Sequence, residues 1–447
     1  MAAPPKMLLH LLLLLFSAVE IHSNAEENFD VRRHLSTVTR YHVAKDISES
    51  SYVPSSIPDQ CKPIHLNLVA RHGTRAPTKK RMKELEALAS NLELLLENVK
   101  EWESSVQKIP PWLWGWKSPW TGKHKGGELI SEGENELYQL GIRTREKFPE
   151  LFHENYHPDL FPIKATQVSR ASASAVAFGT GLFSGQGNLG HGRHRSFAVT
   201  SESRASDIML RFHDCCQNYK EASLLNTTDQ ACALFTPSEV GLLEWTDDLE
   251  VFILKGYGSS LNYRMGVRLL EDVIQSMEQA IKANEDGLVP GSYELARLRF
   301  AHAETLLPFS CLIGLFLEAS EFEQIQREEP LQLPPKPPQK RIWLGSTVAP
   351  FAGNNMLVLY RCPANISGKY FVQVLHNEYP IPLPGCENSN FCPFEVFKER
   401  IAAPHLKHDY NDICTVESER KSPTCKISQL LSWLFPSNAK IHQKDEL

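Results

Sequence analysis

The chain has 447 residues, of which 42% are hydrophobic and 22% charged, an ordinary globular composition with ample material for a core. This length allows one large domain with a sizeable insertion, or two domains. The formal net charge of −6 argues against a nucleic-acid backbone as partner, because proteins that bind one usually carry a basic excess.

The first 25 residues have the pattern of a secretory signal peptide. Lys6 precedes an apolar stretch from Met7 to Val19, and Ser23 and Ala25 are spaced as at a signal-peptidase site. The apolar stretch is shorter than the roughly 20 residues of a membrane span. We therefore expect cleavage and no membrane span afterwards, with a retained signal anchor as the alternative. Residues 26–60 are polar and mixed, and we expect an extended arm.

Strand and helix patterns alternate over the next segment, residues 61–204. The apolar run 64–70 predicts a strand buried on both faces. Helical spacing of leucines follows over 82–100, and Ser131 with Glu134 predicts a capped helix over 131–147. Two further strands are expected at 163–168 and 196–201, separated by a helix rich in small residues.

Residues 205–292 predict a helical insertion, because Glu, Lys and Leu are frequent there and no strong strand pattern occurs. Strand patterns return at 298–301, 355–361 and 370–376 within a second α/β part, residues 293–437. Alternating strands and helices indicate an α/β fold with a mostly parallel sheet flanked by helices.

Residues 438–447 form a tail that ends in an endoplasmic-reticulum retention signal, Lys444-Asp445-Glu446-Leu447. We expect the endoplasmic-reticulum lumen as location, the KDEL receptor as a partner, and partial secretion. The ten cysteines show no zinc-like spacing and favour disulfides, with Cys386–Cys392 as a local pair. Asn226 and Asn365 begin glycosylation sequons.

Charged clusters follow three of the expected strands: Arg71, His72 and Arg75; Arg170; and His302 with Glu304. In open α/β sheets, ligands bind beyond the carboxyl ends of strands, so we expect these clusters to converge. Arginine presents a planar fork of donors that matches a phosphoryl group.

Fixed cations around His72 would lower its pKa and keep a ring nitrogen free to attack phosphorus. Glu304 could then protonate the leaving alkoxide, and His302 could donate to the phosphate. Gly73 would let the backbone approach the substrate closely. The pair His213-Asp214 is a rival proton donor, but it lies in an expected helix with no buried strand before it.

Lys79, Lys80 and Arg81 directly follow the first cluster and could hold further phosphates of an anionic substrate. The equally weighted alternative is that they form the solvated first turn of the next helix. Lys123, His124 and Lys125 are a weaker group of the same kind.

The segment RHGTRAP resembles the RHGxRxP motif of the histidine acid phosphatases, and His302-Ala303-Glu304 resembles the HAE of the multiple inositol polyphosphate phosphatase branch, especially its plant members. Similar segments cover nearly the whole mature chain: RRHLSTVTRYHV, ELISEGENELYQLGIRTREKFPELF, SRASASA, HNEYPIPLPGC and CPFEVFK.

The resemblance implies a phosphoglycerate-mutase-like α/β domain with a helical cap domain over the site. It implies His72 as nucleophile, Glu304 as proton donor, and phosphate ligands at Arg71, Arg75, Arg170 and His302, without metal or cofactor. The implied activity is hydrolysis of inositol polyphosphates, phytate included, through a phosphohistidine. Alternatives are a broad acid phosphatase, a 2,3-bisphosphoglycerate 3-phosphatase, or a non-catalytic luminal protein that binds anions.

Overall fold

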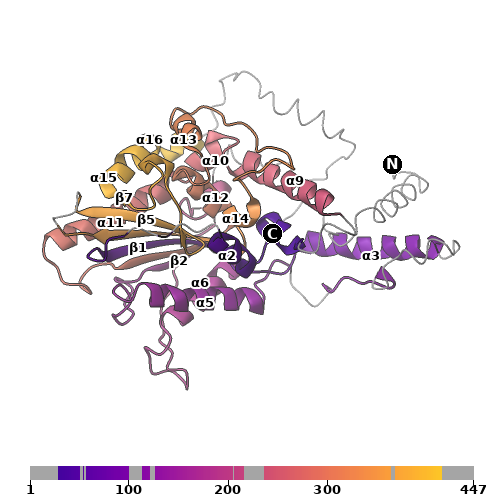
Figure 1. The fold of residues 1–447 in the computed structure, drawn as a ribbon. Coiled ribbons are helices and arrows are strands. Elements are labelled where there is room, and N and C mark those ends of the chain that lie inside the picture. The colour runs from indigo at the N-terminus through magenta and orange to yellow at the C-terminus, as the bar shows by residue number, and fades with distance from the viewer. Residues whose placement is uncertain are drawn as a thin grey trace. The chain divides into compact units, whose positions relative to one another are not determined.

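A mixed sheet with helices on both faces organises the part of the chain that the structure describes (Figure 1). The computed structural model describes residues 29–50, 54, 57–99, 113–120, 126–204, 206–215, 236–363 and 368–414. The expected signal peptide and the C-terminal tail lie outside these residues. The strands of the sheet are Lys62–Arg71 (β1), Ile163–Ala165 (β2), Ala296–Ala301 (β3), Asn354–Arg361 (β4), Tyr370–His376 (β5), Tyr379–Pro380 (β6) and Cys392–Pro393 (β7).

The order of the strands is β2-β3-β1-β4-β5-β6, with β7 also paired to β5. The first three strands are mutually parallel, whereas β4 is antiparallel to both β1 and β5. The α/β class is confirmed, but the expectation of a mostly parallel sheet is corrected to a mixed one. The short connection between β4 and β5 allows only an antiparallel return, because a parallel one needs a long crossover.

The helices lie before, between and after these strands. They are Tyr41–Ser50 (α2), Lys79–Val99 (α3), Ser131–Lys147 (α5), Ser169–Leu182 (α6), Phe212–Cys215 (α7), Pro237–Lys255 (α9), Ser260–Arg264 (α10), Val267–Glu285 (α11), Ala303–Leu312 (α12), Ala319–Gln326 (α13), Gly345–Val348 (α14), Phe394–Val396 (α15), Ala403–Leu406 (α16) and Tyr410–Cys414 (α17). Val31–His34 (η2), Ser36–Val38 (η3) and Pro384–Cys386 (η6) are 3₁₀ helices, and Phe397–Ala402 (η7) is a π-helix.

Two hydrophobic clusters fill the space on either side of the sheet. On one face Leu66 and Leu68 pack with Phe178 of α6, and on the other Val69 packs with helices α11 and α12 (Figure 1). Successive residues of a strand point to opposite faces, so a strand buried on both faces must be apolar along most of its length. The expectation for β1 is confirmed on this point.

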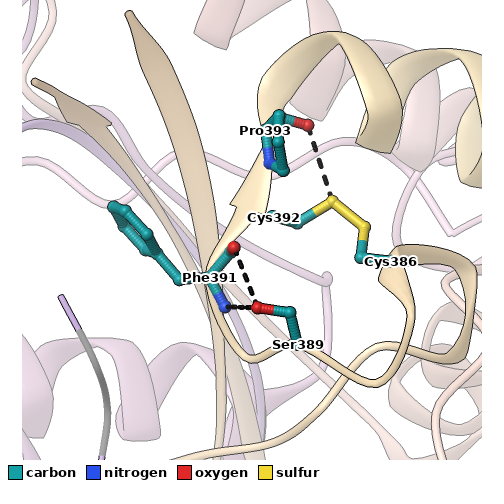
Figure 2. The surroundings of a disulfide bond; sticks show 5 residues. All are labelled: Cys386, Ser389, Phe391, Cys392 and Pro393. Carbon is teal, nitrogen blue, oxygen red and sulfur yellow. Dashed lines mark hydrogen bonds between the residues drawn. A yellow bond between two sulfur atoms is a disulfide. The ribbon is translucent and has the colours of Figure 1, made fainter. Parts of the chain in front are cut away.

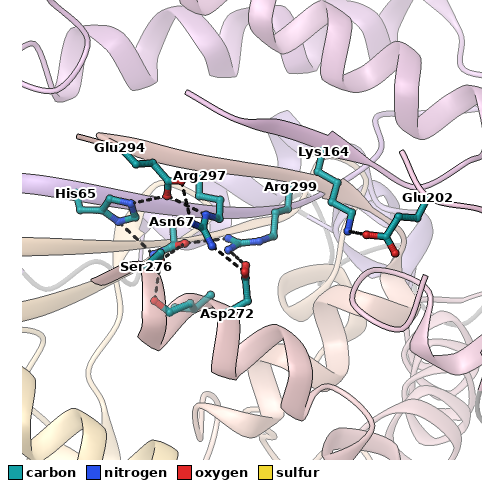
Figure 3. A network of polar contacts seen from close by, with 10 residues as sticks. His65, Asn67, Lys164, Glu202, Asp272, Ser276, Glu294, Arg297 and Arg299 are labelled. Atoms are coloured by element: carbon teal, nitrogen blue, oxygen red, sulfur yellow. Dashed lines mark hydrogen bonds and ion pairs between the residues drawn. The ribbon is translucent and has the colours of Figure 1, made fainter. Parts of the chain in front are cut away.

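A buried polar network ties α11 to the sheet (Figure 3). Arg299 of β3 pairs with Asp272 of α11 and donates to the Asn67 side-chain oxygen at 2.9 Å. His65 is fully buried and lies 3.0 Å from a Glu294 carboxylate oxygen. Every buried charge here has an opposite charge beside it, as burial of ions requires.

The N-terminal arm is helical rather than extended, which corrects the prediction for residues 29–50. Asp30 caps η2 by accepting from the Arg32 backbone N–H, and Tyr41 at the start of α2 donates to Glu378 at 2.8 Å. Tertiary contacts therefore stabilise short helical pieces that the polar composition does not reveal.

Two further local predictions are wrong. The segment 196–201 forms only an isolated bridge, Lys164 to Thr200, instead of a strand. Helix α5 starts at Ser131, but its cap position is Ile130 and makes no side-chain cap bond. The described part of 205–292 consists of helices and turns, while the domain boundaries stay a prediction.

Disulfides close loops at two places. Cys386 pairs with Cys392, which confirms the local pair, and Ser389 between them exchanges hydrogen bonds with the Phe391 backbone (Figure 2). Cys61 pairs with Cys362 across 301 residues of sequence. Cys414 is also disulfide-bonded, whereas Cys311 is a buried free thiol. Within the described ranges, no helix combines the length and apolarity that a membrane crossing needs.

Candidate active site

The carboxyl ends of β1 and β3 bring the first and third charged clusters together. Arg71 pairs in register with Ala301, and the His72 backbone N–H donates to the Ala301 carbonyl at 2.9 Å. The rings of His72 and His302 consequently lie edge to face with centroids 5.3 Å apart. Parallel pairing of strands distant in sequence thus places both histidines in one site, as expected.

His72 is held in one tautomer. Its Nδ1 lies 2.8 Å from the Gly73 carbonyl oxygen, which can only accept, so Nδ1 carries the proton and Nε2 keeps its lone pair. Burial lowers the pKa of His72 well below its usual value, and the charge on Arg71 lowers it further. The side chain is therefore a neutral imidazole with an unprotonated Nε2.

His302 is neutral for similar reasons. Arg211 Nη1, a donor only, lies 3.0 Å from His302 Nε2, so Nε2 accepts and Nδ1 carries the proton. Thr166, just beyond β2, lies 3.2 Å from the same nitrogen. The Nδ1 atom is buried without a hydrogen-bond partner in the described residues, which leaves one N–H for a ligand.

Arg71 is fixed by backbone carbonyls. Its Nη1 donates to Thr37 of the N-terminal arm at 2.5 Å and to Ala349 at 2.6 Å, and the guanidinium lies over the Phe351 ring. Burial lowers its pKa to about 9, with Arg75 as the next cause. A guanidinium with this value stays charged at neutral and acidic pH.

Arg75 and Arg170 add positive charge to the same place. Burial lowers the pKa of Arg170 to about 10, and the neighbouring charge of Arg75 contributes to the same shift. The Nε atoms of both, like that of Arg71, are buried without a hydrogen-bond partner among the described residues. Unpaired buried donors are costly, and an anion bound between these groups would satisfy them.

Glu304 lies in the first turn of α12, beside this positive cluster. Its carboxylate pairs with Lys255 Nζ at 3.1 Å, and the two side chains are 30% and 25% exposed. Burial alone would raise the pKa of Glu304, but neighbouring groups, with the Lys255 ammonium first among them, hold it well below its usual value. The carboxyl is therefore ionised in the free protein.

The loop that carries the first cluster packs tightly against helix α5. Glu136 accepts from the Thr74 backbone N–H at 2.7 Å and from its hydroxyl at 2.8 Å. A Cβ on Gly73 would lie 2.2 Å from the Gly133 carbonyl oxygen. The close approach that requires glycine in this structure is thus to α5, and the expected approach to substrate stays a prediction.

Sequence reasoning missed several side chains of the site. Arg211 and Lys255 come from the helical region 205–292, and neither residue directly follows a strand. The rival segment with His213 also lies here: His213 is buried and is among the groups that lower the pKa of Glu304. No local sequence pattern marks Arg211 or Lys255, because each meets its partner in the site only after folding.

The expected outer phosphate ligands lie at the start of α3. Lys79 and Lys80 are exposed, and Arg81 pairs with Glu84 at 2.5 Å. Their role stays a prediction. Lys123, His124 and Lys125, and both sequon asparagines, Asn226 and Asn365, lie outside the described residues. In the described ranges, no cluster of three or more His, Cys, Asp or Glu side chains is arranged to hold a metal ion.

Known proteins resemble this chain along most of its length. Multiple inositol polyphosphate phosphatase 1 of Dictyostelium discoideum is 24% identical over 81% of this chain and 69% of that protein. The protein of the same name from Homo sapiens is 23% identical and covers 84% of each chain.

Solved structures share the fold. The phytase from D. castellii has a TM-score of 0.57 at 16% identity, covering 95% of this chain and 96% of that one. The Bifidobacterium longum multiple inositol polyphosphate phosphatase in complex with inositol hexasulfate has a TM-score of 0.54 at 16% identity, covering 83% and 98%. A family model described as "Histidine phosphatase superfamily (branch 2)" matches residues 64–231 and 222–377. The chain therefore belongs to branch 2 of the histidine phosphatase superfamily.

Proposed function

We propose that this protein hydrolyses phosphomonoesters of inositol polyphosphates, inositol hexakisphosphate included, through a covalent phosphohistidine at His72. The proposal rests on the neutral His72, whose Nδ1–H donates to the Gly73 carbonyl while Nε2 has no hydrogen-bond partner among the described residues. Beside it lie the buried Arg71 and the half-buried Arg75 and Arg170, whose Nε atoms are buried. The names of the relatives, and the inositol hexasulfate bound by the Bifidobacterium protein, support the substrate class.

In the first step, His72 Nε2 attacks phosphorus. The N–P bond forms as the P–O bond to the sugar alcohol breaks, and the electron pair of that bond stays on the leaving oxygen. Arg71, Arg75 and Arg170 stabilise the charge on the transferring phosphoryl oxygens, and His302 Nδ1–H adds a neutral donor. Because these groups are already fixed in the free protein, little reorganisation accompanies the reaction.

Glu304 handles the protons. In its carboxylic acid form it gives a proton to the leaving alkoxide, and as carboxylate it then takes one from the water that attacks the phosphohistidine. Each cycle consumes one water and returns His72 and Glu304 to their starting states. Substrate phosphates near Glu304 would favour its protonation, because like charges disfavour the ionised form.

Outer phosphates need positive charge beyond this pocket. Lys79 and Lys80 are exposed at the start of α3, in the segment that directly follows Arg75. We propose that they bind non-reacting phosphates of the substrate, with Arg81 held partly by Glu84. The double variant Lys79→Met/Lys80→Met should raise KM for inositol hexakisphosphate more than KM for an aryl phosphate. Equal effects on both KM values would show that these lysines only form the solvated first turn of α3.

The test of function is a substrate panel across pH with wild type and His72→Ala side by side. The panel holds inositol hexakisphosphate, 2,3-bisphosphoglycerate and an aryl phosphate. We expect kcat/KM to be highest for the hexakisphosphate and to be lost in His72→Ala. A preference for another member would favour the acid phosphatase or bisphosphoglycerate phosphatase alternative, and full activity of His72→Ala would refute the mechanism.

We also propose that the protein is a glycosylated resident of the endoplasmic-reticulum lumen, reached by signal-peptide cleavage and kept there by the KDEL receptor. The disulfides Cys61–Cys362 and Cys386–Cys392 support an oxidising compartment. Removing the last four residues should move the protein to the medium, and an endoglycosidase should lower its mass. Unchanged intracellular retention after that deletion would contradict the retention step.

A further inference from the structure

The ion pair between Lys255 and Glu304 conflicts with the role of Glu304 as an acid. A group that must give up a proton is held as a carboxylate, because an ammonium lies 3.1 Å away. Lys255 comes from α9, in the helical region between β2 and β3, and Glu304 is the one ion-pair partner of its Nζ among the described residues. In the free protein Glu304 is therefore a carboxylate, and it must take up a proton before it can act as the acid.

We propose that Lys255 is a phosphate ligand for polyphosphorylated substrates and that it moves from Glu304 to a phosphate next to the one being transferred. Release of Glu304 then lets it take a proton from solvent and act as the acid. The inference rests on the proposed function, and it names the feature by which the site would distinguish polyphosphates from simple monoesters.

Three observations support this exchange. Both side chains are partly exposed, so the pair is open to ligand and solvent. Lysine is a compact charge on a flexible stem, which suits a change of partner better than an arginine fork. Lys255 lies in the last turn of α9, and the chain leaves the helix at Gly256, so its side chain extends from the end of a rigid element.

The charged and titratable groups near Glu304 come from several elements. Lys255 belongs to α9, His213 to α7, and His302, a neutral imidazole, directly precedes α12. Arg71 at the end of β1, Arg75 in the loop after it and Arg170 in α6 add positive charge nearby. A bound phosphoryl group neutralises much of the arginine charge for any substrate. Lys255 is the cation in direct contact, and only a second phosphate can draw it away.

Simple monoesters therefore leave Lys255 on Glu304. For wild type we expect the high-pH limb of the kcat profile to lie at least one pH unit lower with glycerol 2-phosphate than with inositol hexakisphosphate, because kcat reports the groups of the bound complex. This comparison needs no variant. Coincident limbs, with both substrates hydrolysed, would overturn the proposal while leaving the proposed function intact.

Lys255→Met should speed the turnover of glycerol 2-phosphate and weaken the binding of inositol hexakisphosphate. With glycerol 2-phosphate at pH 6, kcat should rise about tenfold, since one pKa unit changes the protonated fraction of Glu304 about tenfold. With inositol hexakisphosphate, KM should rise about 10- to 100-fold, the range for one lost hydrogen bond to a charged group. Lys255→Arg should keep the wild-type preference.

Lys398→Met provides the control, because Lys398 pairs with Glu278 at 2.5 Å as a more exposed lysine–glutamate pair away from the site. Lys398→Met should leave kcat and KM unchanged for both substrates. A fall in glycerol 2-phosphate turnover in Lys255→Met, with thermal stability retained, would show that Lys255 assists Glu304 instead of restraining it. An unchanged KM for the hexakisphosphate would remove Lys255 from the substrate site.

Discussion

Asp248 couples the N-terminal arm to protein stability in a pH-dependent way. It is fully buried in α9 and accepts from the Ser36 hydroxyl at 2.9 Å and from the Gly345 backbone N–H at 2.8 Å, while Arg341 pairs with its other oxygen at 2.8 Å. Burial raises its pKa to about 6, and neighbouring Glu244 adds to the shift. The next residue after Ser36 supplies the carbonyl that holds Arg71.

The direction of the effect follows from proton binding. The pKa of Asp248 is about 6 in the folded protein against 3.8 for an unperturbed aspartate. Between these values the folded state binds more protons, so the free energy of unfolding falls as pH rises. A difference of about 2 pKa units, at about 1.36 kcal/mol each, amounts to about 3 kcal/mol. This stabilisation is complete below pH 4 and lost above pH 6.

Asp248→Asn removes this titration. We expect the free energy of unfolding of wild type, minus that of the variant, to fall by about 3 kcal/mol between pH 4 and pH 7 in urea titrations. Taking the difference cancels the groups that titrate equally in both proteins. Asp159→Asn, at a carboxylate 88% exposed, should give a flat difference. A flat difference for Asp248→Asn as well would refute the reasoning.

Three further variants test the pocket and its supports. Arg170→Ala should lower kcat on an aryl phosphate by about 10²- to 10³-fold, as loss of an oxyanion donor does; a change below threefold would exclude it from the pocket. Gly73→Ala should lower both Tm and kcat, because its Cβ would meet the Gly133 carbonyl oxygen at 2.2 Å; wild-type values would show that the loop can shift freely. Cys392→Ser, which opens the loop to Cys386, should cost about 2 kcal/mol of unfolding free energy in denaturant titrations, and no loss would mean that this disulfide is not formed.

The parts of the site that follow strands could be predicted from the sequence. A run such as 64–70 is mostly apolar and buried on both faces, and the side chain after it must lie at the ligand-binding edge of the sheet. This logic found Arg71, His72 and His302 without a structure. It also gave strands β1, β3, β4 and β5 nearly to their ends.

The rest depends on contacts between segments distant in sequence. Arg211 and Lys255 carry no local sign of function, since each lies in or beside a helix and meets its partner only after folding. The N-terminal arm is similar: its polar residues favour no regular element, and Ser36 is fixed by Asp248, 212 residues away. The local sequence pattern around a residue does not predict contacts with residues so distant in the chain.

The proposed mechanism requires a covalent phosphoryl group on His72, and rapid-quench trapping can detect it. The enzyme would be mixed with an aryl phosphate, whose leaving group needs no proton, quenched in alkali and digested for peptide mass analysis. We expect a phosphate on the peptide with His72, and more of it in Glu304→Gln, because water attack then lacks its base. Turnover with no phosphopeptide, or with the phosphate on another residue, would contradict it.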